Sequence, residues 1–270
     1  MQSGNIQLLG KGRRAGMVNV MYASDLDNTL IFSKDSANTS ICDTYKNGAH
    51  SYISNRVKEE LIKLDTDTRV QFIPVTSRSL EEYNRVNLGI VPDYAIVANG
   101  GMILYQGSPI LEWEEYVKRF NVQMDMIDIM HTVEDYFDDI SSLRVVDNKY
   151  VFFKVQNIYE FDKNVDYLEQ LFNKWTFTRI KNKVYCIPNH FSKQIALRWL
   201  WHKLNKPYII ASGDSILDLP MLTLANEAII PSGSSLITDG YVVDATTTPG
   251  GVKGPLFTID RVLKKVKEYD

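Results

Sequence analysis

Short apolar runs alternate with helical periodicity along the first hundred residues. The runs are bounded by polar residues, as buried strands of a parallel sheet are, and the segments after the first two have apolar residues at helical spacing. Strand, helix, strand in this order predicts a right-handed, parallel α/β sheet. We expect strands at 18–23, 69–75 and 95–98, and helices at 54–64 and 80–88.

The pattern changes after residue 102. A long helical stretch, two strand-like runs, a helix and two further strand-like runs follow in turn. This order predicts an α+β unit with antiparallel hairpins, inserted into the parallel domain. The expected helices are 112–140 and 161–173, and the expected strands are 143–146, 150–156, 176–180 and 183–187.

The first hairpin of the inserted unit can be predicted in register. If Val145 lies opposite Val151 on the buried face, residues 147–149 form a three-residue turn. The two basic side chains of the other face could meet an anionic substrate, although a solvated, open sheet face is the more ordinary outcome. That other face carries Arg144, Phe152 and Lys154.

Parallel α/β patterning resumes after residue 189. The expected strands are 207–211, 227–230 and 241–244, and the expected helices are 194–204, 219–225 and 255–268. Polar and Gly-rich composition predicts loops at 33–50 and 246–254. We therefore expect a flexible N-terminal extension (1–16), a core domain (17–102 and 190–270) and a cap domain (103–189).

Composition narrows the function classes. The 270 residues are 44% hydrophobic and 23% charged, as in a soluble globular protein, and the net charge of −3 gives no reason to expect nucleic-acid or membrane binding. Cys42 and Cys186 are far apart and outside metal-ligand spacing, which favours free thiols in the cytoplasm. No apolar run approaches the ~20 residues of a membrane span.

Two aspartates follow the first predicted strand. Asp25 and Asp27 are two residues apart, so an extended backbone would point both carboxylates toward one reacting centre. Like charges this close resist joint ionisation, which predicts a bound cation or a shared proton. The alternative is a polar strand end that caps the next turn.

Further polar residues stand at or just after the ends of other predicted parallel strands and at the start of a helix. Thr76 could bind an anion together with helix N-terminal amides, or be a simple N-cap. With Lys193, Asp214 and Asp218, the set contains oxygen ligands for Mg²⁺, a carboxylate nucleophile, an acid, and donors for phosphate oxygens. Together these residues predict a phosphoryl-transfer site where ligand sites form in open α/β sheets.

The order of these motifs resembles the haloacid dehalogenase superfamily. The matching segments are DLDNTL at Asp25, VTSR at Thr76, the lysine at Lys193 and GDSILD at Asp214, and they extend over the chain from Met17 onward. The inserted cap and Asn99-Gly100-Gly101 are similar to the subgroup of Cof-type and sucrose-phosphate phosphatases. The resemblance implies a Rossmann-like core with a parallel sheet and an inserted α+β cap.

The resemblance also implies roles for the motif residues. Asp25 would be the nucleophile, Asp27 the acid and then the base, Thr76 a donor to the phosphoryl group, and Lys193 its counter-charge. Mg²⁺ would be held by Asp25, the backbone carbonyl of Asp27 and Asp214, with Asp218 in support. One departure is Leu217, where the subgroup usually has Asn. Candidate substrate contacts are Ser77, Arg78, Asn99, Gly100, Arg144, Lys154 and His190, of which His190 could instead be a hinge or surface residue.

The leading hypothesis is a Mg²⁺-dependent phosphatase that hydrolyses a small phosphomonoester, a phosphorylated sugar, through an aspartyl-phosphate. The alternatives are a phosphohexomutase and a non-catalytic phosphometabolite-binding protein. The expected partner is a small phosphorylated metabolite, with no nucleic acid or membrane. We expect a monomer or a weak homodimer.

Overall fold

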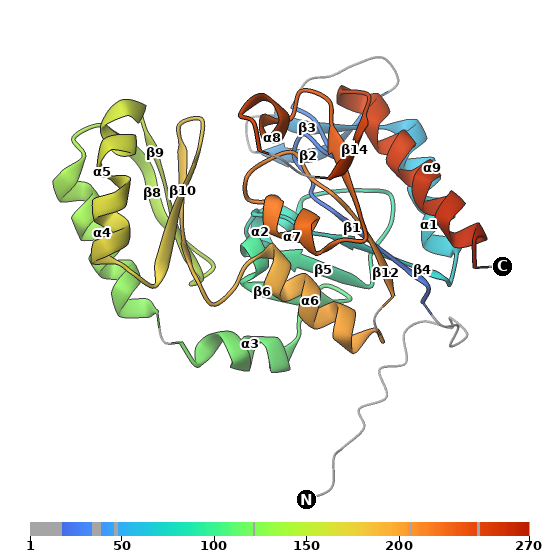
Figure 1. Cartoon of the computed structure of the whole chain (residues 1–270), viewed down its shortest axis with the longest axis horizontal. Helices are drawn as coiled ribbons and strands as arrows, with labels where there is room; N and C mark the ends of the chain where they lie inside the picture. Colours follow the sequence, from blue (N-terminus) through green and yellow to red (C-terminus); the bar gives the residue numbers. More distant parts are fainter. Residues whose placement is uncertain are drawn as a thin grey trace, which may run out of the picture.

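The computed structural model describes residues 18–269, except 34–38, 46–47, 121, 206 and 242–243. The predicted extension over 1–16 lies outside these residues. Two parts stand side by side, a core on the right of Figure 1 and a cap on the left. None of the described helices is both long and apolar enough to cross a membrane.

Five parallel strands form the central sheet of the core, in the order β14-β13-β12-β1-β4. In β1, every residue is buried, which explains its apolar sequence. Ser24 at its end is level with Ser212 on one side and Pro74 on the other. The predicted parallel sheet is thus confirmed. Its strands are β1 (Val20–Ser24), β4 (Val70–Pro74), β12 (Tyr208–Ser212), β13 (Glu227–Pro231) and β14 (Ala245–Thr248).

Helices cover both faces of this sheet, because alternate residues of β1 point into different apolar layers. Met21 and Ala23 pack in one cluster with residues of α6, whereas Val20 and Tyr22 pack in another with residues of α1 and α9. The helices of the core are α1 (Asn55–Thr66), α2 (Leu80–Asn84), α6 (Lys193–Lys203), α7 (Leu219–Leu224), α8 (Ser235–Thr238) and α9 (Gly254–Lys267), with 3₁₀ turns at η1 (Ala98–Gly100) and η2 (Gly251–Lys253).

Three predictions about the core were wrong. The strand expected at 241–244 is not present at Tyr241 or Asp244, and residues 242–243 lie outside the described part. The edge strand β14 lies instead in the predicted loop, where three β-branched threonines pair with β13. The strand expected at 95–98 is present as β5, and a parallel bridge from Val75 to Ile96 places it beside β4, although its continuous pairing is with β6. Strands β5 (Tyr94–Val97), β6 (Met102–Tyr105) and β7 (Ser108–Pro109) form their own sheet.

The third error is the loop expected at 33–50. This segment contains most of an antiparallel hairpin, β2 (Thr39–Tyr45) and β3 (Gly48–Ser54), whose strands pair only with each other. Its polar composition concealed the strands, since Asp43 and Ser51 are buried through ion pairing and hydrogen bonding rather than apolar packing. Asn47-Gly48 between two strand-compatible runs is the signal that could have revealed it.

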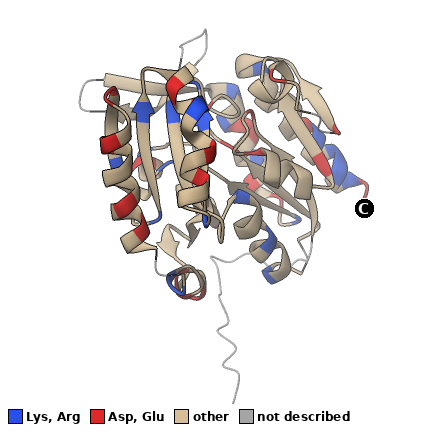
Figure 2. Cartoon of the chain, turned by 60° about the vertical axis from the view of Figure 1, so that its left-hand side comes forward, with Lys and Arg blue, Asp and Glu red and all other residues tan. Residues whose placement is uncertain are grey.

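The cap is a four-stranded antiparallel sheet, β10-β11-β9-β8, with two helices on its outer face (Figure 1). Figure 2 shows acidic positions along those helices and basic ones on the strands. Val145 lies opposite Val151, as predicted. The bounds are α4 (Gln123–Tyr136), β8 (Ile140–Val146), β9 (Tyr150–Val155), α5 (Ile158–Leu171), β10 (Trp175–Ile180) and β11 (Lys183–Pro188).

Two predictions about the cap need correction. The single helix expected at 112–140 is two helices, α3 (Leu111–Lys118) and α4, because Trp113 packs into the core cluster whereas Ile129 packs into the cap. The face of the cap sheet that carries Phe152, which was expected to be open to solvent, is instead partly covered, since Phe152 is buried among core residues. The predicted domain boundaries themselves stay a prediction.

Candidate functional site

The predicted site residues meet at the carboxyl end of the core sheet. Asp25 directly follows β1 and its N–H donates to the carbonyl of Ser212 (2.9 Å), while the N–H of Thr76, just beyond β4, donates to the carbonyl of Ile96 (2.9 Å). Both side chains are buried. Their positions follow from the parallel strand order, since the carboxyl ends of neighbouring strands lie along one edge.

Lys193 lies between an aspartate that follows β1 and one in the loop after β12. It is the first residue of α6, is 1% exposed, and its Nζ lies 2.6 Å from Oδ1 of Asp25 and 2.6 Å from Oδ1 of Asp218. Burial alone would lower the pKa of this amine, but the two carboxylates together raise it. Lys193 is therefore a fixed positive charge between two carboxylates.

Asp218 organises the loop after β12. Its Oδ2 accepts hydrogen bonds from the N–H of Asp214 (3.2 Å) and from the N–H (3.0 Å) and Oγ (2.9 Å) of Ser215. Gly213 allows this approach, because a Cβ there would lie 2.4 Å from the Cβ of Asp218. Leu217, the departure from the subgroup pattern, is buried in the apolar cluster beneath the loop.

Three carboxylates form a set that could hold a metal ion. Asp25, Asp214 and Asp218 each offer an oxygen, and these oxygens lie within 4.8 Å of one another. Burial and the repulsion of Asp218 raise the pKa of Asp25 well above its usual range and that of Asp214 to about 7. A hard divalent cation such as Mg²⁺ binds carboxylate oxygens and would relieve this repulsion, so the donor set fits the predicted ion.

The side chain of Asp27 does not belong to this set of three and is instead paired with an arginine. Arg78 donates to it from Nε and Nη2, both at 2.8 Å, so the carboxylate is held by two parallel hydrogen bonds. The side chain of Asp27 remains 47% exposed, whereas that of Arg78 is 8% exposed. Arg78, proposed from the sequence as a substrate contact, thus binds and orients Asp27.

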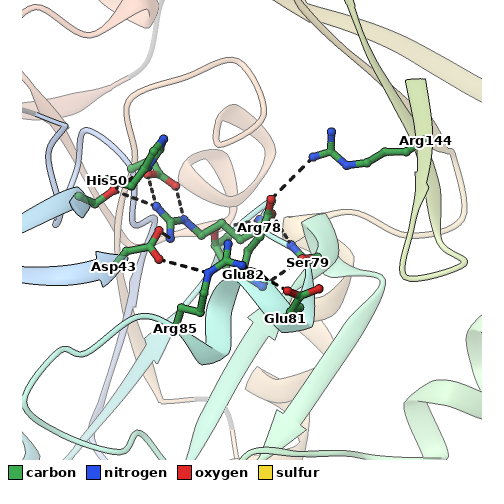
Figure 3. A network of polar contacts seen from close by, with 11 residues as sticks. Asp43, His50, Arg78, Ser79, Glu81, Glu82, Arg85 and Arg144 are labelled. Atoms are coloured by element: carbon green, nitrogen blue, oxygen red, sulfur yellow. Dashed lines mark hydrogen bonds and ion pairs between the residues drawn. The ribbon is translucent and has the colours of Figure 1, made fainter. Parts of the chain in front are cut away.

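The same arginine is anchored by residues that sequence reasoning missed. Arg78 Nη1 donates to Asp43 (2.6 Å) and Nη2 to the hydroxyl of Ser51 (3.1 Å), both on the β2–β3 hairpin. Arg85 contacts the other oxygen of Asp43 at 3.4 Å. Because Asp43 is fully buried, its charge is balanced mainly by these two arginines, and the hairpin is joined to the site through them (Figure 3).

Aromatic residues of the cap face the loop after β4. The hydroxyl of Tyr150 donates to the carbonyl of Ser77 (2.7 Å), and the ring of Tyr185 packs edge-on against Phe152 with centroids 5.3 Å apart. Burial, together with the nearby charge of Asp27, raises the pKa of Tyr185 to about 12. Sequence reasoning missed both tyrosines, since only the docking of the cap brings them here.

Three cap and junction residues expected at the site have other contacts. Arg144 lies over the ring of Phe152 (4.3 Å) and 3.7 Å from Glu82, and half-buried Lys154 is in register with Lys183. His190 stacks on Phe120 at 3.9 Å between ring centroids, and burial lowers its pKa to about 4. Within the described part of the chain, none of the three contacts the carboxylate set.

Asn99 and Gly100 lie on the core side, in a strained turn. Asn99 has a φ of 54° and Gly100 a φ of 95°, and a Cβ on Gly100 would lie 2.2 Å from the carbonyl oxygen of Ser192. Glycine is therefore required for this turn to pack against the start of α6. The N–H of Asn99 donates to the carbonyl of Thr76 (3.0 Å), which places Asn99 beside the site.

The chain is similar to known proteins in sequence and in structure. The family model of sucrose-6F-phosphate phosphohydrolase matches residues 18–235. A search of curated proteins finds no match to this sequence. The solved structures that are similar in fold share low sequence identity with the chain.

Three of these structures illustrate the likeness. The sucrose-phosphatase of Synechocystis sp., solved with sucrose and phosphate, is 15% identical, with a TM-score of 0.65 over 92% of this chain and 98% of that one. The C-terminal domain of trehalose-6-phosphate phosphatase from C. albicans is 10% identical (TM-score 0.62, 93% of each chain). A haloacid dehalogenase-like hydrolase from Bacillus subtilis is 13% identical (TM-score 0.56, 92% and 96%). At such identities the likeness shows the fold.

Proposed function

The chain belongs to the sucrose-6F-phosphate phosphohydrolase family, phosphatases of the haloacid dehalogenase type, and we propose that it is a Mg²⁺-dependent enzyme that hydrolyses a small phosphorylated sugar through an aspartyl-phosphate. The observation that carries this proposal is the buried lysine 2.6 Å from two carboxylates, beside a third. The family match gives no support to the phosphohexomutase alternative.

Asp25 is the proposed nucleophile. One carboxylate oxygen forms a bond to phosphorus while the bond from phosphorus to the sugar oxygen breaks. Lys193, 2.6 Å from Asp25, is a positive charge beside the developing negative charge, and Thr76 offers a hydroxyl donor at the same edge of the sheet. Asp25, Asp214 and the backbone carbonyl of Asp27 would hold Mg²⁺, with Asp218 in support, and the ion would supply charge neutralisation for the phosphate oxygens.

Asp27 is the proposed acid and base. It gives a proton to the departing sugar oxygen, and its carboxylate then takes a proton from the water that attacks phosphorus and releases Asp25 and inorganic phosphate. Its exposed position lets water and substrate reach it, and the two hydrogen bonds from Arg78 fix the direction of its oxygens. Orientation of this kind is a large part of phosphoryl-transfer catalysis.

The test is phosphate release from a panel of phosphorylated sugars with and without Mg²⁺. Asp25→Asn should lower kcat by at least about a thousandfold, because an amide cannot form the intermediate. The matched control is Asp260→Asn, an exposed aspartate of α9 paired with Lys264, which should keep wild-type activity. Wild-type turnover by Asp25→Asn would remove the nucleophile assignment. Accumulation of an isomerised hexose phosphate instead of free phosphate would favour a mutase.

A further inference from the structure

The β2–β3 hairpin places two buried polar side chains next to each other. Asp43 of β2 is in register with Ser51 of β3, and the side chain of Asp43 is 0% exposed. The register of the two strands shifts on both sides of Asp43. Irregularities of this kind redirect a side chain and are common beside active sites. The backbone of β2 therefore departs from regular pairing at the residue that contacts Arg78.

The guanidinium of Arg78 is held from two directions. Its Nε and Nη2 donate to the two oxygens of Asp27, both at 2.8 Å. Its Nη1 donates to Asp43 at 2.6 Å, and Nη2 also donates to Ser51 at 3.1 Å. Asp43 and Arg78 point toward each other in Figure 3. Because a guanidinium is planar and rigid, the hairpin determines the angle at which Arg78 meets Asp27.

The backbone of Arg78 is fixed by other contacts. Its N–H donates to the hydroxyl of Thr76 (3.1 Å), and its carbonyl accepts from the N–H of Ala98 (2.8 Å). Beyond this backbone is a long side chain with several rotatable bonds, which needs contacts at its far end to keep one rotamer. Asp43 and Ser51 supply such contacts, so the contribution of the hairpin is the orientation of the guanidinium.

The hairpin is attached to the core without the pair of Asp43 and Arg78. The N–H of Asn87 donates to the carbonyl of Cys42 (2.7 Å), and Arg85 contacts Asp43 from a second side (3.4 Å). Burial of a charge costs free energy, and a hairpin that is already attached gains little from it. An orienting role accounts for the second arginine on this carboxylate.

From this geometry, and resting on the proposed function, we infer that Asp43 and Ser51 are positioning residues for protonation of the leaving group. They hold the guanidinium of Arg78, which holds the carboxyl of Asp27 so that its proton faces the oxygen of the sugar. When the bond between phosphorus and that oxygen breaks, the bonding electrons stay with the oxygen and the proton of Asp27 moves to it. Asp43 and Ser51 act only through Arg78.

Aryl phosphates with different leaving groups test this role. 4-Nitrophenolate leaves without a proton, whereas phenolate is helped by one, and kcat/KM reflects leaving-group departure rather than later hydrolysis of the intermediate. Asp43→Asn should lower kcat/KM about tenfold for phenyl phosphate and less than about threefold for 4-nitrophenyl phosphate, because a misdirected acid matters only where a proton is needed. Both values come from one preparation, so partial unfolding cancels in their ratio. A ratio equal to that of the wild-type protein would overturn the inference.

Ser51→Ala tests the second contact, and it replaces Asp43→Asn if that variant does not fold. Loss of one hydrogen bond to Arg78 should move the ratio in the same direction by about threefold. The control is Glu227→Gln, which removes a carboxylate from the similar pair with Arg261 at the amino end of β13 and should keep the wild-type ratio. An equal shift in Ser51→Ala and in the control would overturn the role of Ser51.

The Arg78→Ala background tests whether Asp43 acts through the guanidinium. Once that group is absent, the addition of Asp43→Asn should change the ratio of the two kcat/KM values by less than about twofold, because residues that act as a unit are not additive. A further tenfold change would overturn the route through Arg78.

Hydrogen exchange of the guanidinium separates this inference from the proposed function. The Nε–H of Arg78 can be followed by NMR and is identified by its loss in Arg78→Ala. In Asp43→Asn it should exchange with water about tenfold faster, because its contact with Asp27 opens more often. If the wild-type protein hydrolyses both aryl phosphates and Asp43→Asn leaves their ratio unchanged, the positioning role fails and the phosphatase stands. Faster exchange in Asp43→Asn, with no phosphate released from any ester by the wild-type protein, would uphold the orientation of Asp27 and overturn the phosphatase.

Discussion

Three acidic side chains at one end of the sheet repel one another, and this repulsion should appear in the stability of the metal-free protein. The folded pKa of Asp214 is raised from 3.8 to about 7, and Asp25 is shifted in the same direction. Between pH 3.8 and about pH 7 the folded state binds more protons than the unfolded state. The contribution of Asp214 to the free energy of unfolding therefore falls as pH rises. Below pH 3.8 both states are protonated and the effect is absent.

We therefore expect the metal-free protein to have a lower Tm at about pH 8 than at about pH 5. Mg²⁺ should raise Tm more at the higher pH, where the carboxylates are ionised and can bind it. Calorimetric scans with and without Mg²⁺ measure both effects. In Asp214→Asn the difference in Tm between the two pH values should shrink, and a metal-free Tm that rises with pH in the wild-type protein would contradict the argument.

A substitution of Arg78 tests whether this residue orients Asp27. The planar guanidinium makes two parallel hydrogen bonds to the carboxylate of Asp27, which lysine cannot make. Arg78→Lys keeps the charge but frees Asp27 to turn, so kcat should fall by about ten- to a hundredfold, less than the roughly hundred- to ten-thousandfold expected if general acid–base catalysis were lost entirely. Arg261→Lys is the matched control, since Arg261 binds Glu227 in the same two-fold manner through Nε and Nη2. Equal kcat values in the two variants would remove the orienting role of Arg78.

At the scale of elements, the turn at Asn99-Gly100 fixes how the loop after β5 meets α6. Gly100→Ala would bring a Cβ within 2.2 Å of the Ser192 carbonyl oxygen, so either the turn or the start of α6 must move. The free energy of unfolding should drop by about 3 kcal/mol or more, and activity should fall because Lys193 adjoins the displaced backbone.

Gly107→Ala separates the steric clash from the cost of backbone conformation. Gly107 has a similar φ of 80° but nothing within 4 Å of a Cβ, so the substitution should cost only about 1 kcal/mol and leave activity intact. Urea unfolding of both variants gives the comparison. Similar losses in the two would show that the contact with Ser192 is not what requires glycine.

Sequence patterns predicted the parallel sheet and the acidic loops well, because strand runs and turn residues are local signals. The predicted ends of the strands before Asp25 and Asp214 were enough to predict that these aspartates lie at one edge of the sheet. Asp43 was not predicted, since its burial depends on a pairing with Arg78 across 35 positions and its hairpin is too polar to read as buried. Tyr150 and Tyr185 were also missed as neighbours of the site, because the packing of the cap against the core produces no pattern of apolar residues in the sequence of either part.

At the scale of the whole molecule, polar contacts between described residues join the cap to the core near the site. The hydroxyl of Tyr150 donates to the carbonyl of Ser77, the N–H of Leu80 donates to Asp147 (2.7 Å), and Arg144 lies 3.7 Å from Glu82. Any movement of the cap away from the core would have to break these contacts. The strength of the contacts should therefore set how often the cap opens.

Tyr150→Phe removes one of these contacts without changing the ring. The loss is about 1 kcal/mol, so amide hydrogens in the loop around Ser77 should exchange about fivefold faster. Tyr159→Phe, at a position 77% exposed, should leave exchange unchanged. Hydrogen exchange read by mass spectrometry distinguishes the two, and identical protection of the loop in both variants would argue against a latch at Tyr150.

The position of β1 between β12 and β4 has a consequence for the order in which the protein is made. On the ribosome β1 emerges early, whereas β12 follows only after the whole cap has been synthesised. At roughly 5–20 residues per second, one edge of this apolar strand waits on the order of ten seconds or longer for its partner. Unpaired apolar edges promote aggregation, so a chain halted before residue 208 should depend on chaperones more than the finished protein does.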